Sequence, residues 1–180
     1  IADAADLIRL GMEAVLKARS EFIVEASVNS LNDLHVAVEH QPQVMVIDER
    51  LDPGVDILQI VEDVLQISPK TQVLVSGYLR DGLLIRDLFA VGCRGYLYKG
   101  DELQDSLICA IETVMRDRLY LSPTANAEYL TAMQTPQRDW QLDQEARGVL
   151  RLLAQGRHVG QIALALDIHP RRVYWVREKL

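Results

Sequence analysis

The chain has 180 residues, of which 49% are hydrophobic and 25% charged, an ordinary globular composition that allows one large domain or two small ones. This composition excludes a disordered tail, a collagen-like repeat and a disulfide-stabilised scaffold. No apolar run approaches the roughly 18 residues that a membrane span requires, and the N-terminus lacks the layout of a signal peptide. We therefore expect a soluble, cytoplasmic protein with no membrane partner.

The charge is distributed unevenly along the chain. Residues 1–137 contain 11 basic and 21 acidic side chains, whereas residues 138–180 contain 8 basic and 5 acidic ones. Because a polyanion is attracted by a positive surface, only the C-terminal part is expected to bind nucleic acid.

The two cysteines, Cys93 and Cys109, lie in apolar stretches with no second cysteine or histidine at metal-ligand spacing. We therefore expect two buried, reduced thiols rather than a disulfide or a zinc site.

Short β-type runs alternate with helical patterns in the first two thirds of the chain. The five expected strands are Ile1–Asp3, Phe22–Ala26, Val44–Ile47, Val73–Val75 and Gly95–Tyr98. The five expected helices cover residues 6–18, 31–39, 57–65, 82–91 and 102–116. Strands that are apolar on both faces and are separated by helices indicate a parallel sheet covered on both sides. The sequence therefore predicts an α/β fold, a flavodoxin-like doubly wound sheet of five parallel strands.

The last third of the chain has a different pattern. Residues 119–140 contain two prolines and a short helical stretch, which is typical of a linker with one helix. Residues 142–155 and 159–166 are expected helices, and a third begins with Pro170 as its first residue. A tight turn before a basic last helix indicates a helix-turn-helix. We predict a domain over 1–118, a linker over 119–140 and a small all-α DNA-binding domain over 141–180.

Polar side chains stand at the carboxyl ends of four expected strands: Asp3, Asp48, Ser76 and Lys99. Ligands bind at this edge of doubly wound sheets, so we expect the four to meet there. Asp48 would be the nucleophile in a transient phosphorylation, and Asp3 would help to hold Mg²⁺. Lys99 and Ser76 would bind phosphoryl oxygens. Alternatively the acids are turn or capping residues and Lys99 is solvated; the convergence of all four favours the site.

These stretches resemble the NarL/FixJ-type response regulators, a receiver domain joined to a LuxR-type helix-turn-helix. The resemblance covers nearly the whole chain, and its set of spacings is specific although each piece alone is weak. The matching stretches are Ile1–Asp3, Val44–Asp48 with Asp52–Gly54, Val73–Ser76, Gly95–Lys99, Tyr120–Pro123 and Val149–Gly156.

The resemblance implies a role for each residue of the site. Asp48 would be the phospho-acceptor for a sensor histidine kinase, and Mg²⁺ would be held by Asp3, Asp48 and the backbone carbonyl of Arg50. Ser76 and Tyr96 would be switch residues, and Lys99 would bind the phosphoryl group. The alternative for Tyr96 is a strand aromatic that fills the core.

The resemblance also implies a DNA-binding homodimer and a domain that is C-terminally truncated at Leu180. Arg171, Arg172 and Lys179 would contact phosphates, and Tyr174, Trp175 and Glu178 would face base edges. Two aromatic residues and an acid could instead mark a protein-binding surface. His169 stands at the helix cap, where the family favours Ser or Thr, and His is the poorer acceptor.

One departure separates two hypotheses on function. Ala4 follows Asp3 where the family has a second acid, which should weaken Mg²⁺ binding. The leading hypothesis is a transcription factor, not an enzyme, controlled by phosphorylation of Asp48. The alternative is an atypical receiver, independent of phosphorylation and controlled by a partner protein or a small ligand. A flavodoxin-like cofactor enzyme is rejected because residues 4–7 supply no hydroxyl- or glycine-rich phosphate loop.

Overall fold

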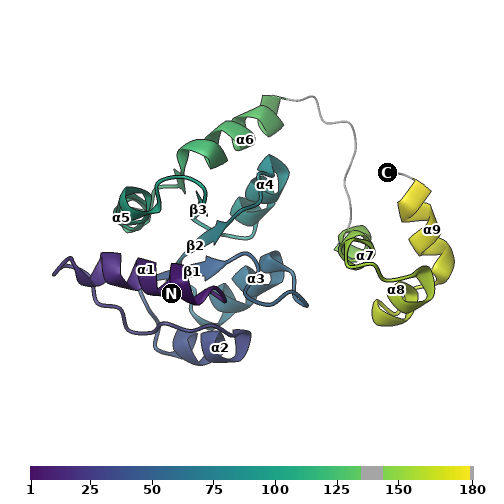
Figure 1. Cartoon of the computed structure of the whole chain (residues 1–180), viewed down its shortest axis with the longest axis horizontal. Helices are drawn as coiled ribbons and strands as arrows, with labels where there is room; N and C mark the ends of the chain where they lie inside the picture. The colour runs from purple at the N-terminus through teal and green to yellow at the C-terminus, as the bar shows by residue number, and fades with distance from the viewer. Residues whose placement is uncertain (135–143, 179–180) are drawn as a thin grey trace. The chain divides into compact units, whose positions relative to one another are not determined.

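The computed structural model describes residues 1–134 and 144–178, without the side chains of Gln144 and Glu178. The chain divides into two compact units, Ile1–Thr135 and Pro136–Leu180, each of which is described by itself (Figure 1). Within the described residues, no helix combines the length and the apolar character needed to cross a bilayer.

A parallel sheet forms the centre of the first unit. Its strands are β1 (Val44–Asp48), β2 (Gln72–Gly77), β3 (Gly95–Tyr98) and β4 (Tyr120–Leu121), in the order β1-β2-β3-β4. The helices of this unit are α1 (Asp6–Lys17), α2 (Leu31–Glu39), α3 (Ile57–Ile67), α4 (Gly82–Ala90), α5 (Leu103–Val114) and α6 (Pro123–Gln134). The predicted α/β fold with a parallel sheet is confirmed.

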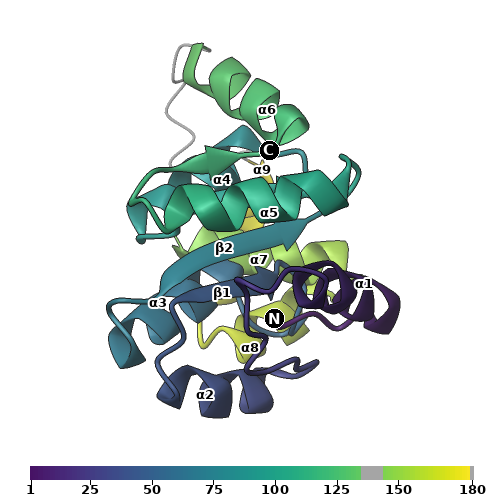
Figure 2. The same cartoon turned by 90° about the vertical axis from the view of Figure 1, so that its left-hand side faces the viewer.

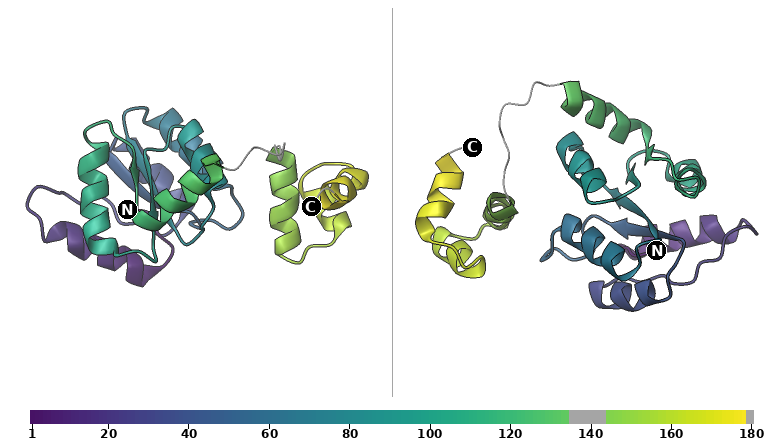
Figure 3. Two further views of the ribbon diagram at one scale, coloured as in Figure 1. Left: turned by 90° about the horizontal axis from the view of Figure 1, so that it is seen from above. Right: turned by 180° about the vertical axis from the view of Figure 1, so that it is seen from behind.

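Helices cover both faces of the sheet, as Figure 2 and the left view of Figure 3 show. Val46, Leu74 and Leu97 pack with residues of α1 and α5 on one face. Ile47, Val75 and other strand residues pack with α2, α3 and α4 on the opposite face. We call these the α1/α5 face and the α3/α4 face. Because successive side chains of a strand alternate between faces, this assignment also fixes the side on which each strand-end residue lies.

The expected number of five strands is wrong. Neither Ile1–Asp3 nor Phe22–Ala26 forms a strand, and this edge of the sheet is reduced to isolated parallel bridges from Ala2 to Val28 and Ile47. The ladder is short because Asp3 already leaves it and turns into the loop before α1. One paired residue on each side does not make a strand.

A strand that the sequence analysis did not expect lies at the opposite edge. β4 pairs in parallel with β3, with Tyr120 beside Gly95 and Leu121 beside Tyr96. Its two residues fall at the start of the expected linker. The predicted pattern missed them because a two-residue strand carries no periodicity.

The two cysteines differ in their surroundings. Cys93 is buried, as expected, but Cys109 is exposed, so the expectation is wrong for Cys109. On α5 the buried neighbours Ile108 and Ile111 face the sheet. Cys109 lies on the solvent side of the same helix because one residue along a helix turns the side chain by about 100°.

Three helices form the second unit: α7 (Gln144–Ala154), α8 (Val159–Ala165) and α9 (Pro170–Glu178). Val149, Ile162 and Val173 are buried in its core. The turn between α8 and α9 contains Asp167 in the left-handed region, with φ of 52°. A short tight turn before the last helix is the helix-turn-helix arrangement.

Candidate functional site

The strand ends place four of the predicted residues on the α1/α5 face of the sheet. Asp48 ends β1 and is paired in register with Ser76 of β2. Lys99 directly follows β3, and its amide donates to the Gly77 carbonyl at 2.7 Å. Asp3 leaves the bridge at Ala2. Asp48, Ser76 and Lys99 each come two residues after a side chain that packs on this face, which is why they point to the same side.

The structure brings Asp3, Asp48 and Lys99 together. The Lys99 ammonium lies 2.7 Å from Asp3 Oδ2 and 2.8 Å from Asp48 Oδ1. The side chains of Lys99, Asp3 and Asp48 are only 2%, 1% and 10% exposed, respectively. Buried charges need partners, and here one ammonium serves two carboxylates. The cluster therefore has a net negative charge that an added cation would offset.

The Ser76 hydroxyl lies beside this cluster without a partner. Ser76 is fully buried, and its Oγ forms no hydrogen bond with the described residues. A buried hydroxyl without a partner costs about 1–3 kcal/mol. It is therefore a group that an additional acceptor at Asp48 would satisfy.

Tyr96 lies on the other face of the sheet, with its ring in the core. It is 1% exposed, and its hydroxyl donates to Glu49 Oε2 at 2.5 Å and lies 3.0 Å from the Leu79 carbonyl oxygen. Burial and the Glu49 carboxylate raise the pKa of Tyr96 above its ordinary value of 10.0. The hydroxyl therefore remains a proton donor throughout the physiological pH range.

Glu49 is a residue that the sequence analysis missed. Its carboxylate is buried and also accepts the amides of Tyr78, at 2.7 Å, and Leu79, at 3.1 Å. Strand alternation offered a signal. Glu49 comes two residues after Ile47, whose side chain belongs to the α3/α4 face, so an acid at this position is directed into the protein.

The predicted DNA-contacting residues lie on α9. Arg171, Tyr174 and Trp175 are exposed, with Tyr174 at 53% and Trp175 at 46%. Arg172 forms an ion pair with Glu145 of α7, at 2.5 Å, and lies 4.4 Å from the centre of the Trp175 ring. The Glu178 side chain and Lys179 lie outside the described residues. The structure thus places one arginine freely at the surface and the other against a carboxylate.

The helix cap before α9 is formed despite the unusual residue. His169 Nδ1 accepts the Arg171 amide at 3.2 Å. A histidine nitrogen therefore serves one of the free amides at the start of the helix.

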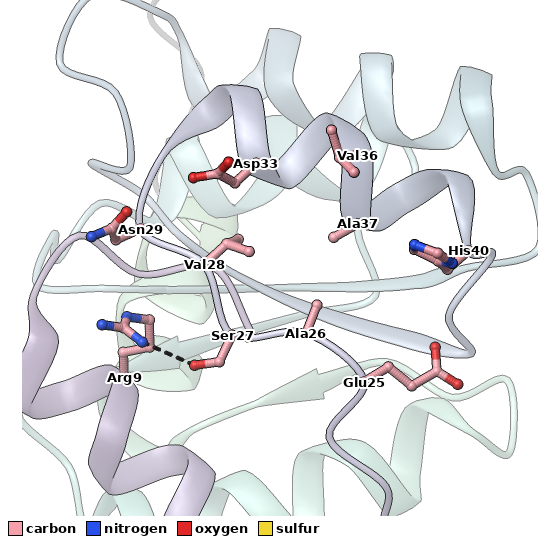
Figure 4. A pocket seen from close by; sticks show the side chains of 10 residues that line it. All are labelled: Arg9, Glu25, Ala26, Ser27, Val28, Asn29, Asp33, Val36, Ala37 and His40. Carbon is pink, nitrogen blue, oxygen red and sulfur yellow. Dashed lines mark hydrogen bonds between the residues drawn. The ribbon is translucent and has the colours of Figure 1, made fainter.

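A pocket of about 430 Å³ lies elsewhere, between α1, α2 and residues 25–29 (Figure 4). On one side of it, Arg9 donates to the neighbouring Ser27 hydroxyl at 3.1 Å. None of the ten residues that line it belongs to the predicted site. The acid cluster is consequently not the floor of this pocket.

No family model matches the chain. The oxygen regulatory protein NreC of Staphylococcus carnosus is 25% identical over 124 residues, which are 68% of this chain and 57% of NreC. The transcriptional regulatory protein LnrK of Bacillus subtilis is 27% identical over 152 residues, 83% of this chain and 64% of LnrK. The chain thus spans about three fifths of the length of both relatives.

A solved structure of RcsB from Salmonella enterica serovar Typhimurium matches with a TM-score of 0.70. It is 15% identical and covers 99% of this chain and 86% of RcsB, which is bound there to the promoter P1flhDC in the presence of the phosphomimetic BeF₃⁻. The chain is thus similar in sequence to the regulatory proteins NreC and LnrK, and it has the fold of RcsB. The first unit has the receiver fold, and the second has the helix-turn-helix fold.

The cluster of Asp3, Asp48 and Lys99 supplies only part of a Mg²⁺ site. Asp3 and Asp48 supply carboxylates of the kind that Mg²⁺ prefers, but Lys99 lies against both of them. Within residues 1–134 and 144–178, no group of three acidic, histidine or cysteine side chains is placed to hold a metal. Ala4 supplies no carboxylate, so the backbone carbonyl of Arg50 and water would complete the coordination.

Proposed function

We propose that this protein is a response regulator, a transcription factor whose receiver is phosphorylated on Asp48 by a sensor histidine kinase. The observation that carries the proposal is the buried cluster of Asp3, Asp48 and Lys99, with the unpartnered Ser76 hydroxyl beside it. Each of these groups has a use in phosphoryl transfer to a carboxylate that an apolar residue would lack.

The chemistry assigns one task to each side chain. A carboxylate oxygen of Asp48 would attack the phosphorus, and the histidine nitrogen of the kinase would leave as the new O–P bond forms. Lys99 would move from its present ion pairs to a phosphoryl oxygen, and Ser76 would donate to another. Bound Mg²⁺, held by Asp3, Asp48 and the carbonyl of Arg50, would neutralise charge on the phosphoryl group.

The second unit would bind DNA through α9. Its exposed Arg171 and the excess of basic residues in residues 138–180 support this assignment. Arg172 and Lys179 would join Arg171 on phosphates, while Tyr174, Trp175 and Glu178 would face base edges. Since one short helix reads few base pairs, a homodimer on paired half-sites is the expected binding form.

The acceptor is tested by incubating the protein with acetyl phosphate and Mg²⁺ and locating the modified residue by mass spectrometry after trapping. We expect one phosphoryl group on Asp48 and none in Asp48→Asn. Modification that persists in Asp48→Asn, or no modification and no binding of beryllofluoride, would overturn the assignment.

DNA binding is tested with Arg171→Glu and a control of equal charge change in the receiver, Arg116→Glu, since Arg116 is exposed in the turn that follows α5. We expect Arg171→Glu to weaken binding to all DNA sequences. The slope of log K against log salt concentration should become shallower by about one, because one phosphate contact is lost. Arg116→Glu should leave both unchanged. Equal effects of the two variants would remove α9 from the interface.

A second candidate is the same transcription factor with a receiver that does not depend on phosphorylation. The observation in its favour is that Glu49 already binds Tyr96 while Asp48 is unmodified.

A further inference from the structure

The buried carboxylate of Glu49 carries an inference that rests on the proposed function, because it concerns the output of the same receiver. We propose that Glu49 is an internal ligand that holds the segment after β2, together with Tyr96, in one conformation while Asp48 is unmodified. Glu49 is then a positioning residue that acts through Tyr78, Leu79 and Tyr96.

The contacts of Glu49 are those of a bound anion. Its side chain is 1% exposed, and it accepts two backbone amides and one hydroxyl. The amides belong to Tyr78 and Leu79, which directly follow β2. Hydrogen bonds to a charged, buried acceptor are about twice as strong as neutral ones, so this carboxylate orders the segment rather than merely touching it.

Gly77 supplies the space that Glu49 occupies. A Cβ at Gly77 would lie 2.0 Å from the Glu49 carboxyl carbon, far inside van der Waals contact. The backbone of Gly77 does not lie in the left-handed region, since the positive-φ glycines of the described residues are Gly92 and Gly156. Gly77 is therefore required here for room and not for backbone geometry.

The segment after β2 is in contact with α6, the last helix of the receiver. Arg80 follows Leu79 and pairs with Glu128 of α6 at 2.7 Å. At Gly82, the first residue of α4, a Cβ would lie 2.2 Å from the Glu128 carbonyl oxygen, so α6 packs closely on the start of α4. The segment after β2 is thus linked to α6 through Arg80, within the first unit.

We expect phosphorylation of Asp48 to change the conformation of the α3/α4 face only slightly. In the switch that the family resemblance implies, a new anion at the phospho-acceptor causes the aromatic residue to turn inward. In this protein the Glu49 carboxylate already binds the Tyr96 hydroxyl while the Tyr96 ring is buried. A phosphoryl group on Asp48 would replace the carboxylate charge of Asp48 on the α1/α5 face, whereas Glu49 lies on the α3/α4 face. We therefore expect the conformation of Tyr78–Leu79 to respond weakly to modification of Asp48.

The first test is amide hydrogen exchange at Tyr78 and Leu79, measured by NMR on the full chain. Glu49→Ala should accelerate exchange at both amides by at least about tenfold, because each loses a charged acceptor. Glu49→Gln retains an oxygen acceptor and should show a smaller increase. Glu62→Ala, an exposed acid on α3, is the control and should change neither amide. Unchanged exchange in Glu49→Ala would overturn the proposal.

The second test is a double-mutant cycle with Gly77→Ala. In the wild-type background this substitution should displace Glu49 and accelerate exchange at Tyr78 and Leu79. In the Glu49→Ala background the methyl group has room, so it should have little further effect. Equal effects of Gly77→Ala in both backgrounds would contradict the arrangement.

The third test separates this inference from the proposed function. Beryllofluoride with Mg²⁺ should bind the wild-type receiver, as followed by ¹⁹F NMR, and leave exchange at Tyr78 and Leu79 within about twofold. Binding with a larger gain in protection would overturn the role of Glu49 and retain the phospho-acceptor. Failure to bind, with Glu49→Ala still accelerating exchange tenfold, would overturn the phospho-acceptor and retain the role of Glu49.

Discussion

Removal of the Lys99 ammonium should strongly lower the free energy of unfolding of the receiver. Lys99 is 2% exposed and is the cation against both Asp3 and Asp48. Substitution Lys99→Met keeps most of the side-chain volume and leaves two buried carboxylates facing each other without a counter-charge. Breaking a buried ion pair by removing one partner costs about 3–5 kcal/mol. Since Asp48 is 10% exposed, we expect the lower part of this range, about 3 kcal/mol in the free energy of unfolding.

The assay is urea unfolding at pH 7, followed by circular dichroism. Both tryptophans of the chain, Trp140 and Trp175, belong to residues 136–180. Tryptophan fluorescence therefore reports unfolding of the second unit and serves as an internal control, whose midpoint should not move. The matched variant is Asp48→Asn, which leaves Lys99 and Asp3 as a one-to-one pair and should change stability by about 1 kcal/mol or less.

A triple variant completes the reasoning. With Asp3→Asn and Asp48→Asn added, Lys99→Met no longer leaves charges unpaired, and most of the lost stability should return. A loss below about 1 kcal/mol in Lys99→Met alone would refute the account, because that is the value of a solvated surface pair. So would a triple variant as unstable as the single one.

Three further outcomes are expected. Ala4→Asp should tighten Mg²⁺ binding in a titration, since it restores a carboxylate that the partial site lacks; no gain would mean that another group already fills the position. Cys109 should react with a thiol reagent at pH 8 while Cys93 does not, because burial raises the pKa of Cys93 from 9.0 to about 11. The unfolded state then loses this proton first, so the Cys93 contribution to stability is constant below pH 9 and falls as the pH rises through 11. His169→Ser should stabilise the second unit by up to about 1 kcal/mol, seen as a higher midpoint of tryptophan fluorescence, because a hydroxyl is the better cap acceptor.

The sequence was sufficient to predict the elements whose apolar residues recur with a clear helical or strand period. The amphipathic helices and the three apolar strands of the sheet centre follow from it, and so does the meeting of Asp3, Asp48 and Lys99. These side chains meet because parallel strands end at one edge, whichever residues fill the loops.

What the sequence could not supply depends on short or non-local contacts. The strand at Tyr120–Leu121 has two residues and forms because Gly95 admits it; a Cβ at Gly95 would lie 2.6 Å from the Tyr120 carbonyl oxygen. The pairing of Arg172 with Glu145 joins residues 27 positions apart. Periodicity within a helix predicts which side faces the core and says nothing of such a partner.

Successive side chains of a strand point to opposite faces of the sheet. This explains why one edge of the sheet holds two sets of polar residues with different tasks. Asp48, Ser76 and Lys99 follow Val46, Leu74 and Leu97 by two residues and lie on the α1/α5 face. Glu49 and Gly77 follow Ile47 and Val75 by two residues; the Glu49 side chain packs against Gly77 and accepts the Tyr96 hydroxyl on the α3/α4 face. Adjacent positions in the chain are thereby divided between a cluster suited to phosphoryl chemistry and a carboxylate that positions a loop. Because the two sets share backbone but no side-chain contact among the bonds described, Asp48→Asn should leave exchange at Tyr78 and Leu79 unchanged, and Glu49→Gln should leave the Lys99 ion pairs in place.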